Sequence, residues 1–422
     1  MSRRMIAAAG AEVWVAIDLS TIRDVIQVMS ELNRTNRSFG VKLGLEAIVG
    51  IGLEDLFNWT RVASRFVDGK FCDIPNTVAG AARSLQRFKP MIFNVHANGG
   101  VCMMEAAVKE RGRSNVFAVT VLTSMDDAKD EPLHSYGCDS KLGVARFAAM
   151  AAKAGVQGLI CSPADLGILN GLGVDDLLRL CPGIRPSWAS AKGDQSRVTT
   201  PAEAAVAGAD GIVVGRPVLS PPIGMTRTRA LQMVHDEFRL MTALRELGGI
   251  LRGHYVYKSG RHGPLYFNKD VLWGTLDADQ AAQAIVDSLP KNYHYDAVVG
   301  PETGGAKLAK IIGGMMGQEC QRAYKTDYGF AFDSWDSKWK EVLIVEDVLT
   351  TGGSLDKVIS AVQDRGGSVT VKRALLNRGG VQMPGLETIA TLGAVSYAAE
   401  DCPLCKSGVP ISTDAGHAKP KL

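Results

Sequence analysis

A chain of 422 residues is long enough for about two or three domains. It holds 47 Lys and Arg against 44 Asp and Glu, and this near balance argues against a nucleic-acid or membrane-surface partner. No apolar run is long enough to span a bilayer, and the eight cysteines lack the spacing of a disulfide framework, so we expect reduced thiols and a cytoplasmic location.

The first half of the chain alternates short apolar segments with helix-like segments rich in Ala and Leu. This alternation predicts a closed parallel (β/α)8 barrel, that is, a TIM barrel, with an open doubly wound sheet as the alternative. Polar residues at the segment ends favour the barrel, because an open sheet does not predict them there. The expected strands are 13–17, 39–43, 65–70, 91–95, 116–122, 158–161, 180–182 and 211–214.

The third expected strand ends in an unusual run of charged residues. Asp68 and Lys70 are two apart, so their side chains point to the same face of the strand, and Asp73 follows beyond the strand end. A carboxylate beside an ammonium at the carboxyl end of a strand is where such a barrel keeps its chemistry. A structural ion pair would explain Asp-x-Lys alone, so the residues that follow it carry the argument.

Other strand ends add charge to the same rim. Asp18 ends the first expected strand, Lys42 the second and His96 the fourth, and Thr123 follows the fifth. Each has an ordinary explanation by itself, as a cap, a buried hydrogen bond or a solvated charge. Together with the third strand they place carboxylates and ammonium groups on one rim of the barrel.

The last two loops of the barrel predict a phosphate site. Gly215 permits close approach of the backbone, and Arg216 offers two parallel hydrogen bonds to an anion. Gln195 lies in a Gly-Asp-Gln segment just upstream. Phosphate sites in these barrels form after strands seven and eight, which is where these residues stand.

Residues 10–220 resemble orotidine 5′-monophosphate (OMP) decarboxylase. The resemblance rests on five segments: Asp68-x-Lys-x-x-Asp-Ile-Pro-Asn-Thr, Leu122-Thr-Ser-Met, Pro182-Gly-Ile-Arg-Pro, Gly193-Asp-Gln and Gly215-Arg-Pro. Related barrels that decarboxylate or cleave sugar phosphates share Asp-x-Lys-x-x-Asp. They usually use a metal and lack Asp-Ile-Pro-Asn-Thr, so they are the alternative for this half.

The resemblance implies roles for these residues, with no metal or cofactor. Lys42, Asp68 and Lys70 would form an alternating charge array, which Asp73 of a partner subunit completes. Lys70 would stabilise the carbanion left by CO2 and protonate it. The implied OMP-binding residues are Asp18, Thr123, Gln195, Gly215 and Arg216.

A break at Ser220-Pro-Pro predicts a domain boundary near residue 224. We therefore expect one domain over 1–224 and a second over 225–422. The segment 226–247 has apolar residues at helical spacing and could belong to either domain.

The second half contains a buried-strand pattern at 342–345, which we expect Glu346 and Asp347 to end. A turn rich in glycine and hydroxyl groups follows and leads into a helix, an arrangement that can cradle a phosphate at the helix N-terminus. The acidic pair could accept hydrogen bonds from ribose hydroxyls. The turn consists of Thr350, Thr351, Gly352, Gly353 and Ser354.

This stretch resembles the phosphoribosyl pyrophosphate (PRPP) signature of type I phosphoribosyltransferases, which have an α/β fold. Residues 258–268, Lys-Ser-Gly-Arg-x-x-Pro-x-Tyr-Phe-Asn, narrow the resemblance to orotate phosphoribosyltransferase. It implies that Lys258 contacts PRPP, that Tyr266, Phe267 and Arg378 hold orotate, and that 300–305 form the pyrophosphate loop. Mg2+ would arrive with PRPP, bound through substrate and water oxygens and not through an assigned side chain.

One segment departs from the family. The mobile loop before the PRPP strand usually carries several basic residues and a histidine, whereas 321–340 offers only Arg322 and Lys325 near its start and no histidine. Two alternatives therefore stay open for this domain. It could be a silent binding or dimerisation module, or a phosphoribosyltransferase for another base.

The tail contains Cys402-Pro-Leu-Cys405, which raises the question of zinc. The sequence offers one such pair without an evident fourth ligand, so we expect a tight turn with two thiols. His262 is expected to be a surface hydrogen-bond donor.

The two halves resemble enzymes of consecutive reactions, since the product of the second is the substrate of the first. The whole resembles the bifunctional UMP synthases, in decarboxylase-first order. The implied substrates are orotate, PRPP and OMP, and the resemblance implies a homodimer or larger homo-oligomer, because sites in both families are completed across a two-fold interface.

Overall fold

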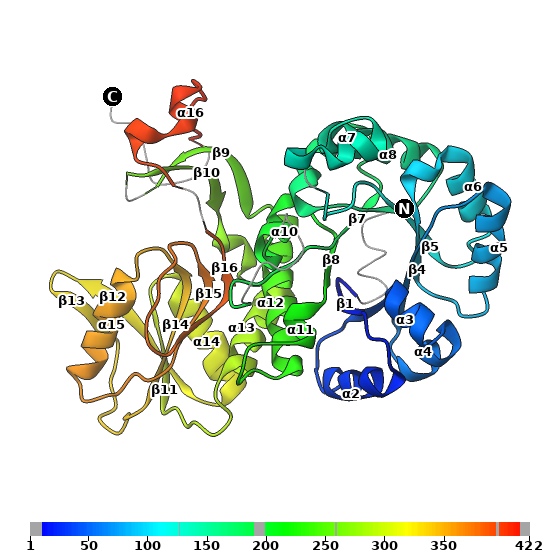
Figure 1. Ribbon diagram of the computed structural model, residues 1–422. Helices are drawn as coiled ribbons and strands as arrows, with labels where there is room; N and C mark the ends of the chain where they lie inside the picture. The colour runs from blue at the N-terminus through cyan, green and yellow to red at the C-terminus, as the bar shows by residue number, and fades with distance from the viewer. Residues whose placement is uncertain (1–10, 126, 190–198, 258–259, 394–395, 414–422) are drawn as a thin grey trace. The chain divides into compact units, whose positions relative to one another are not determined.

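The computed structural model describes residues 11–413 except 126, 190–198, 258–259 and 394–395 (Figure 1). The chain divides into two compact units, 1–238 and 239–422. The division falls within helix α12 (Arg227–Glu246), which continues from one unit into the other. The boundary near residue 224 stays a prediction.

The first unit contains the expected closed barrel of eight parallel strands. Strand β1 closes the barrel by pairing with β8, with Val13 opposite Ile212. The prediction of a (β/α)8 barrel is confirmed. The strands are β1 (Val13–Ile17), β2 (Gly40–Leu43), β3 (Ser64–Phe71), β4 (Ile92–His96), β5 (Asn115–Val119), β6 (Gly158–Ile160), β7 (Leu178–Cys181) and β8 (Gly211–Val214).

Helices connect the barrel strands and surround them (Figure 1). Inside the barrel, Trp14 meets Phe66 edge to face, with ring centroids 6.1 Å apart, in a buried cluster that also contains Phe117. These large rings fill the interior, so polar chemistry is confined to the strand ends. The helices of four or more residues are α2 (Ile22–Leu32), α3 (Leu45–Gly50), α4 (Leu53–Trp59), α5 (Pro75–Leu85), α6 (Val101–Lys109), α7 (Glu131–Tyr136), α8 (Ser140–Lys153), α9 (Leu166–Leu169), α10 (Pro201–Ala207) and α11 (Arg216–Leu219).

The second unit is built on a six-stranded sheet in the order β13-β12-β11-β14-β15-β16. Only β13 runs antiparallel to its neighbour. The expected α/β phosphoribosyltransferase fold is confirmed. The strands are β11 (Ala297–Pro301), β12 (Glu319–Thr326), β13 (Gly329–Phe332), β14 (Val342–Leu349), β15 (Lys372–Asn377) and β16 (Leu386–Thr391), and the main helices are α13 (Leu276–Ser288), α14 (Gly304–Met316) and α15 (Gly353–Gln363).

A separate two-stranded antiparallel sheet joins β9 (Ile250–Val256) to β10 (His262–Phe267). A single turn, η4 (Lys269–Leu272), follows β10. Near the end of the described chain, the turn η5 (Ala399–Asp401) leads into the short helix α16 (Pro403–Lys406).

Two expectations about the second unit need correction. Strand β14 does not end at the acidic pair but continues to Leu349, because Val348 and Leu349 still pair with β15. The segment 321–340 is not one long loop, because β12 and β13 form a hairpin within it, with Lys325 opposite Phe330.

Among the helices of the described residues, none combines the length and the apolar composition needed to cross a membrane.

Candidate functional site

Four charged side chains alternate along the carboxyl ends of β1, β2 and β3. The Lys42 ammonium lies 3.2 Å from a carboxylate oxygen of Asp18 and 2.8 Å from one of Asp68. The other oxygen of Asp68 lies 2.7 Å from the Lys70 ammonium. Asp68 therefore lies between two cations. Its distances to the two ammonium groups are those of charge-assisted hydrogen bonds.

Burial and charge act in opposite directions in this array. Burial alone would raise the pKa of Asp68, but the ammonium groups of Lys42 and Lys70 outweigh it and lower that pKa to about 2. Burial would lower the pKa of Lys42, yet Asp68 and Asp18 raise it above its ordinary value. Asp68 and Lys42 are thus both stabilised in their charged forms.

Asn94 on β4 completes the array and was missed by the sequence reasoning. It is fully buried, its side-chain N–H donates to Asp68 at 2.7 Å, and its side-chain oxygen accepts from the main-chain N–H of Lys70 at 2.8 Å. The only signal in the sequence is one polar residue inside an otherwise apolar strand.

The backbone of β3 departs from regular strand geometry at this point. Its register with β4 shifts between Val67 and Phe71, and Lys70 has a φ of 46°. A positive φ is uncommon for a residue with a side chain, and such strain collects at functional sites. At this irregularity the ammonium of Lys70 lies 2.7 Å from the carboxylate of Asp68.

These side chains line a cavity of about 560 Å3 at the end of the barrel. Arg185, which belongs to the Pro-Gly-Ile-Arg-Pro segment but was not singled out from the sequence, also lines it. Asp73 does not; it is exposed, and its carboxylate accepts from the N–H of Ile74. Gln195 lies outside the described residues. The sequence-predicted residues in the cavity wall are Asp18, Lys42, Asp68, Lys70, Thr123, Gly215 and Arg216.

The acidic pair of the second unit lies beside the start of α14. Asp347 forms an ion pair with Lys269, a residue that the sequence reasoning missed. Gly304, the first residue of α14, allows this approach, because a Cβ there would overlap the Asp347 carboxylate. Burial, followed by the nearby Asp347, raises the pKa of Glu346 well above its ordinary value.

A second cavity, of about 620 Å3, lies over the turn that follows β14. Lys325 lines it together with Thr351, Gly353 and Ser354, and Lys357 of α15 adds a cation not expected from the sequence. Gly352 has a φ of 78° and precedes α15. The cavity thus combines lysines with the N-terminus of a helix, which favours an anion.

Arg322 is placed differently. Its guanidinium pairs with Asp333 of the same hairpin at 2.8 Å, and both side chains are about half exposed. Arg322 does not line the cavity that contains Lys325.

Arg378 lies between two aromatic rings. Its guanidinium is 4.8 Å from the ring centre of Tyr257 and 5.1 Å from that of Phe267. Its Nε is buried without a hydrogen-bond partner among the described residues, so one donor is left for an anion. Lys258 lies outside the described residues.

The expectations for His262 and for the segment with Cys402 and Cys405 also need correction. His262 is only 8% exposed and is not a surface donor. Cys402 is fully buried and Cys405 lies in α16, so the segment is a helical turn with one thiol inside and one exposed.

Comparison with known proteins divides the chain in the same way. Residues 11–222 match the family described as orotidine 5′-phosphate decarboxylase / HUMPS family, and residues 274–382 match the phosphoribosyl transferase domain. The two matches stand in decarboxylase-first order.

Two individual relatives agree with the first match. Orotidine 5′-phosphate decarboxylase of Rhodospirillum rubrum is 40% identical over 220 residues, which are 49% of this chain and 86% of that protein. The protein of the same name from Alkalilimnicola ehrlichii is 44% identical over 183 residues, covering 42% and 77%. The solved structure of Leishmania donovani UMP synthase is 16% identical with a TM-score of 0.43 and covers 92% of each chain. The chain belongs to the orotidine 5′-phosphate decarboxylase / HUMPS family and carries a phosphoribosyltransferase domain in its second half.

Proposed function

We propose that the second domain makes OMP from orotate and PRPP, and that the first domain converts this OMP to UMP and CO2. The observation that carries the proposal is the Asp18–Lys42–Asp68–Lys70 array in the wall of the barrel cavity. The second match supports it, because a phosphoribosyltransferase for orotate would supply the substrate of the first domain.

In the decarboxylation, the substrate carboxylate would lie beside Asp68, whose lowered pKa keeps it charged. The bond between C6 and the carboxylate breaks, CO2 leaves, and the electron pair stays on C6. The Lys70 ammonium stabilises that negative charge and then gives C6 its proton. Loss of CO2 also removes a repulsion between two carboxylates.

The 5′-phosphate would bind beside Gly215 and Arg216, which line the same cavity after β8. Arg185 adds a second guanidinium to the cavity wall. Gln195, expected to join them, lies outside the described residues. Binding energy from the phosphate, which does not react, would position the base against Lys70.

In the transferase, the phosphate of PRPP would bind at Thr351, Gly353 and Ser354, beside Lys325. A nitrogen of orotate attacks the anomeric carbon of PRPP while the bond to pyrophosphate breaks; pyrophosphate takes the electron pair, and the N–H proton of orotate passes to solvent. The carboxylates of Glu346 and Asp347 would accept hydrogen bonds from the ribose hydroxyls.

Mg2+ belongs to this proposal as the partner of the pyrophosphate. Hard carboxylate oxygens such as those of Glu346 and Asp347 are donors of the kind that Mg2+ accepts directly or through water, so the residues present fit the ion. When bound, Mg2+ would neutralise part of the pyrophosphate charge.

The base site would consist of Arg378 with Tyr257 and Phe267. A planar anion can stack against the rings and take a hydrogen bond from the guanidinium. This arrangement supports orotate over an uncharged base. Binding of orotate, uracil and a purine base, measured by calorimetry with PRPP present, compares the candidates; preference for another base would contradict the assignment.

A silent second domain is the competing possibility, and the pairing of Arg322 with Asp333 favours it, since that arginine is occupied outside the cavity. We test it with Arg322→Ala and Lys325→Ala. Loss of transferase turnover only in the second variant would support the role of Lys325. Turnover that survives both changes would show that neither cation matters.

The first experiment combines full-length protein with orotate, PRPP and Mg2+ and identifies the products by mass. UMP is expected. If it does not form, OMP is added directly: conversion then limits the proposal to the first domain, and no conversion refutes the decarboxylase part.

We also propose a homodimer or larger homo-oligomer and a cytoplasmic location. Asp73 is exposed and outside the cavity of its own subunit, which leaves it available to a second copy. Asp73→Ala and Lys70→Ala proteins are each expected to be inactive as decarboxylases, and mixing them should restore activity in hybrid dimers. An active monomer in sedimentation would contradict the proposal.

A further inference from the structure

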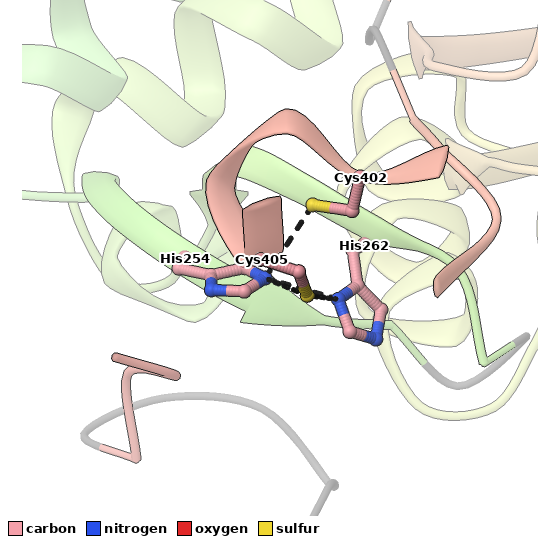
Figure 2. Close-up of side chains that lie close together, drawn as sticks. All are labelled: His254, His262, Cys402 and Cys405. Atoms are coloured by element: carbon pink, nitrogen blue, oxygen red, sulfur yellow. Dashed lines mark hydrogen bonds between the residues drawn. The ribbon is translucent and has the colours of Figure 1, made fainter. Parts of the chain in front are cut away.

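Four side chains that can bind a metal meet at one point of the second unit. His254 of β9 and His262 of β10 face Cys402, just before α16, and Cys405 within it (Figure 2). One ligand atom from each residue lies within 4.8 Å of all the others. The two strands and the tail segment are about 140 residues apart in sequence, so only the fold brings the four together.

Four distances between the ligand atoms can be compared with those of a tetrahedral site. Nε2 of His254 lies 3.6 Å from Sγ of Cys402 and 3.5 Å from Sγ of Cys405. Nδ1 of His262 lies 3.3 Å from Sγ of Cys405 and 3.0 Å from Nε2 of His254. Zinc bonds of about 2.0–2.3 Å in a tetrahedron place ligand atoms about 3.3–3.8 Å apart, so three of these four distances fall within that range and the His–His distance is shorter.

A neighbouring carbonyl group determines which ring nitrogen of His254 carries the proton. Its Nδ1 lies 2.7 Å from the carbonyl oxygen of Val409. A carbonyl can only accept, so Nδ1 carries the proton and Nε2 presents its lone pair to the two sulfurs. Metal-binding histidines are held by this kind of contact, which fixes the ring and its tautomer.

Burial also fits a metal site. His254 is 1% exposed, His262 8% and Cys402 fully buried, while Cys405 is exposed. Two imidazoles and two thiols form one of the usual ligand sets of structural zinc, and soft sulfur ligands disfavour Mg2+ or Ca2+.

We propose that His254, His262, Cys402 and Cys405 bind one zinc ion that fastens the C-terminal segment to the β9–β10 hairpin. All four positions are filled by protein, so the site is structural and not catalytic. This ion would take no part in the proposed reactions.

The neighbouring contacts indicate that the ion would fasten the tail to the hairpin. A two-stranded hairpin is marginal by itself. The tail also bonds the hairpin through its backbone: His262 pairs with Tyr397, and the N–H of Ser412 donates to His254 at 2.7 Å. Strand β10 carries Phe267, whose ring centre lies 5.1 Å from the Arg378 guanidinium, so the ion would steady one partner of that contact.

The direct test measures zinc in purified full-length protein. About one zinc per chain is expected, as a four-ligand site requires. Cys405→Ser and His262→Asn should lose it, while Cys320→Ser, a partly buried cysteine of the same unit, should keep it. Protein without zinc, or a Cys405→Ser variant that retains a full equivalent, would overturn the proposal.

Cobalt and thiol chemistry separate zinc from a disulfide. Replacing zinc by Co2+ should give the visible bands of a tetrahedral ion and the near-ultraviolet band of a thiolate ligand. Iodoacetamide should spare Cys402 and Cys405 until a strong chelator is added. A mass lower by two hydrogens at this pair, or thiols that react without chelator, would contradict the site.

A last measurement distinguishes loss of the fastening role from general unfolding of the protein. Chelation should raise hydrogen exchange in β9, β10 and α16 and leave β11 and the barrel strands unchanged. Decarboxylase turnover, which belongs to the other unit, should persist. Unchanged exchange in the hairpin after zinc has left would refute the fastening role.

Discussion

The main-chain N–H of Lys70 donates to the side-chain oxygen of Asn94, while the side-chain N–H of Asn94 donates to Asp68. A single buried amide thus holds both the strained backbone of Lys70 and the carboxylate beside it. The geometry of the charge array therefore depends on a neutral side chain.

Asn94→Ala should therefore reduce decarboxylation without removing any charged group. A Lys70 displaced by about 1 Å could lower kcat by about a hundredfold. The unpaired buried groups should cost about 1–3 kcal/mol of stability. Steady-state kinetics with OMP checks this. Asn115→Ala, at the amino end of β5, is the control, and transferase turnover of both variants should equal that of the unchanged protein.

The charge on Asp68 should contribute to stability above its unfolded pKa. The pKa falls from 3.8 to about 2 on folding, so the contribution is present above about pH 4 and is lost as the pH falls through about 2. The shift corresponds to about 2 kcal/mol. We expect the stability difference between the unchanged protein and Asp68→Asn to be constant from pH 5 to 8 and to shrink below pH 4.

Hydrogen exchange of the barrel strands at a series of pH values measures that difference without interference from the second unit. Asp24→Asn, an exposed carboxylate in α2, is the control. A difference that grows as the pH falls would reverse the sign and reject the assignment.

Glu237 of α12 predicts the opposite pH dependence. Burial is the main reason that its pKa rises from 4.5 to about 8, despite the N–H of Ala202, which donates to it at 3.2 Å. A carboxyl group whose pKa is raised on folding stabilises the folded state at pH values below its unfolded pKa. That contribution is lost as the pH rises through about 8, and the free energy of unfolding falls by at most about 1.4 kcal/mol per pH unit.

Glu237→Gln should remove this slope and make the barrel more stable than the unchanged protein above pH 8. Residual decarboxylase activity after heating, at pH 6 to 9, measures it. Exposed Glu105→Gln is the control. Parallel pH profiles for the unchanged protein and Glu237→Gln would show that Glu237 is charged throughout.

Two glycines of α14 form a matched pair for the transferase. A Cβ on Gly304 would overlap the carboxylate of Asp347 and approach Lys269, whereas a Cβ on Gly314 meets nothing within 4 Å. Gly304→Ala should therefore displace the acidic residue and reduce transferase kcat/KM by at least about tenfold, the effect of about 1.4 kcal/mol.

Gly314→Ala should keep full transferase activity and stabilise α14 by about 0.5–1 kcal/mol, because alanine is the better helix former. Kinetics with PRPP as the varied substrate and thermal unfolding check the pair. Equal transferase activity of both variants would show that the position of Asp347 is unimportant.

The barrel was predictable because its strands are short, apolar and regularly spaced, and because charged residues mark their ends. Asp68 and Lys70 could be placed together for the same reason. Asn94 could not, since one polar residue in a strand has several possible partners, and only the register of β3 and β4 selects Asp68 and Lys70.

In the second unit, the acidic pair and the glycine-rich turn were predictable from the sequence. The end of one strand and the positions of some side chains were less predictable. The end of β14 depends on pairing with β15, which local sequence does not reveal. The position of Arg322 depends on Asp333 across a hairpin, and that of His254 on cysteines near the end of the described chain. Contacts of this kind are set by tertiary structure and not by residue spacing.

The closure of the barrel has a consequence for the order of events during synthesis. Val13 of β1 can pair with Ile212 of β8 only after nearly the whole first unit has left the ribosome. Pairing over such a separation is slow, because the long intervening loop must first be closed. A translational pause beyond β8, while the second unit is still being made, would give β1 time to find its last neighbour before a second set of strands competes for it.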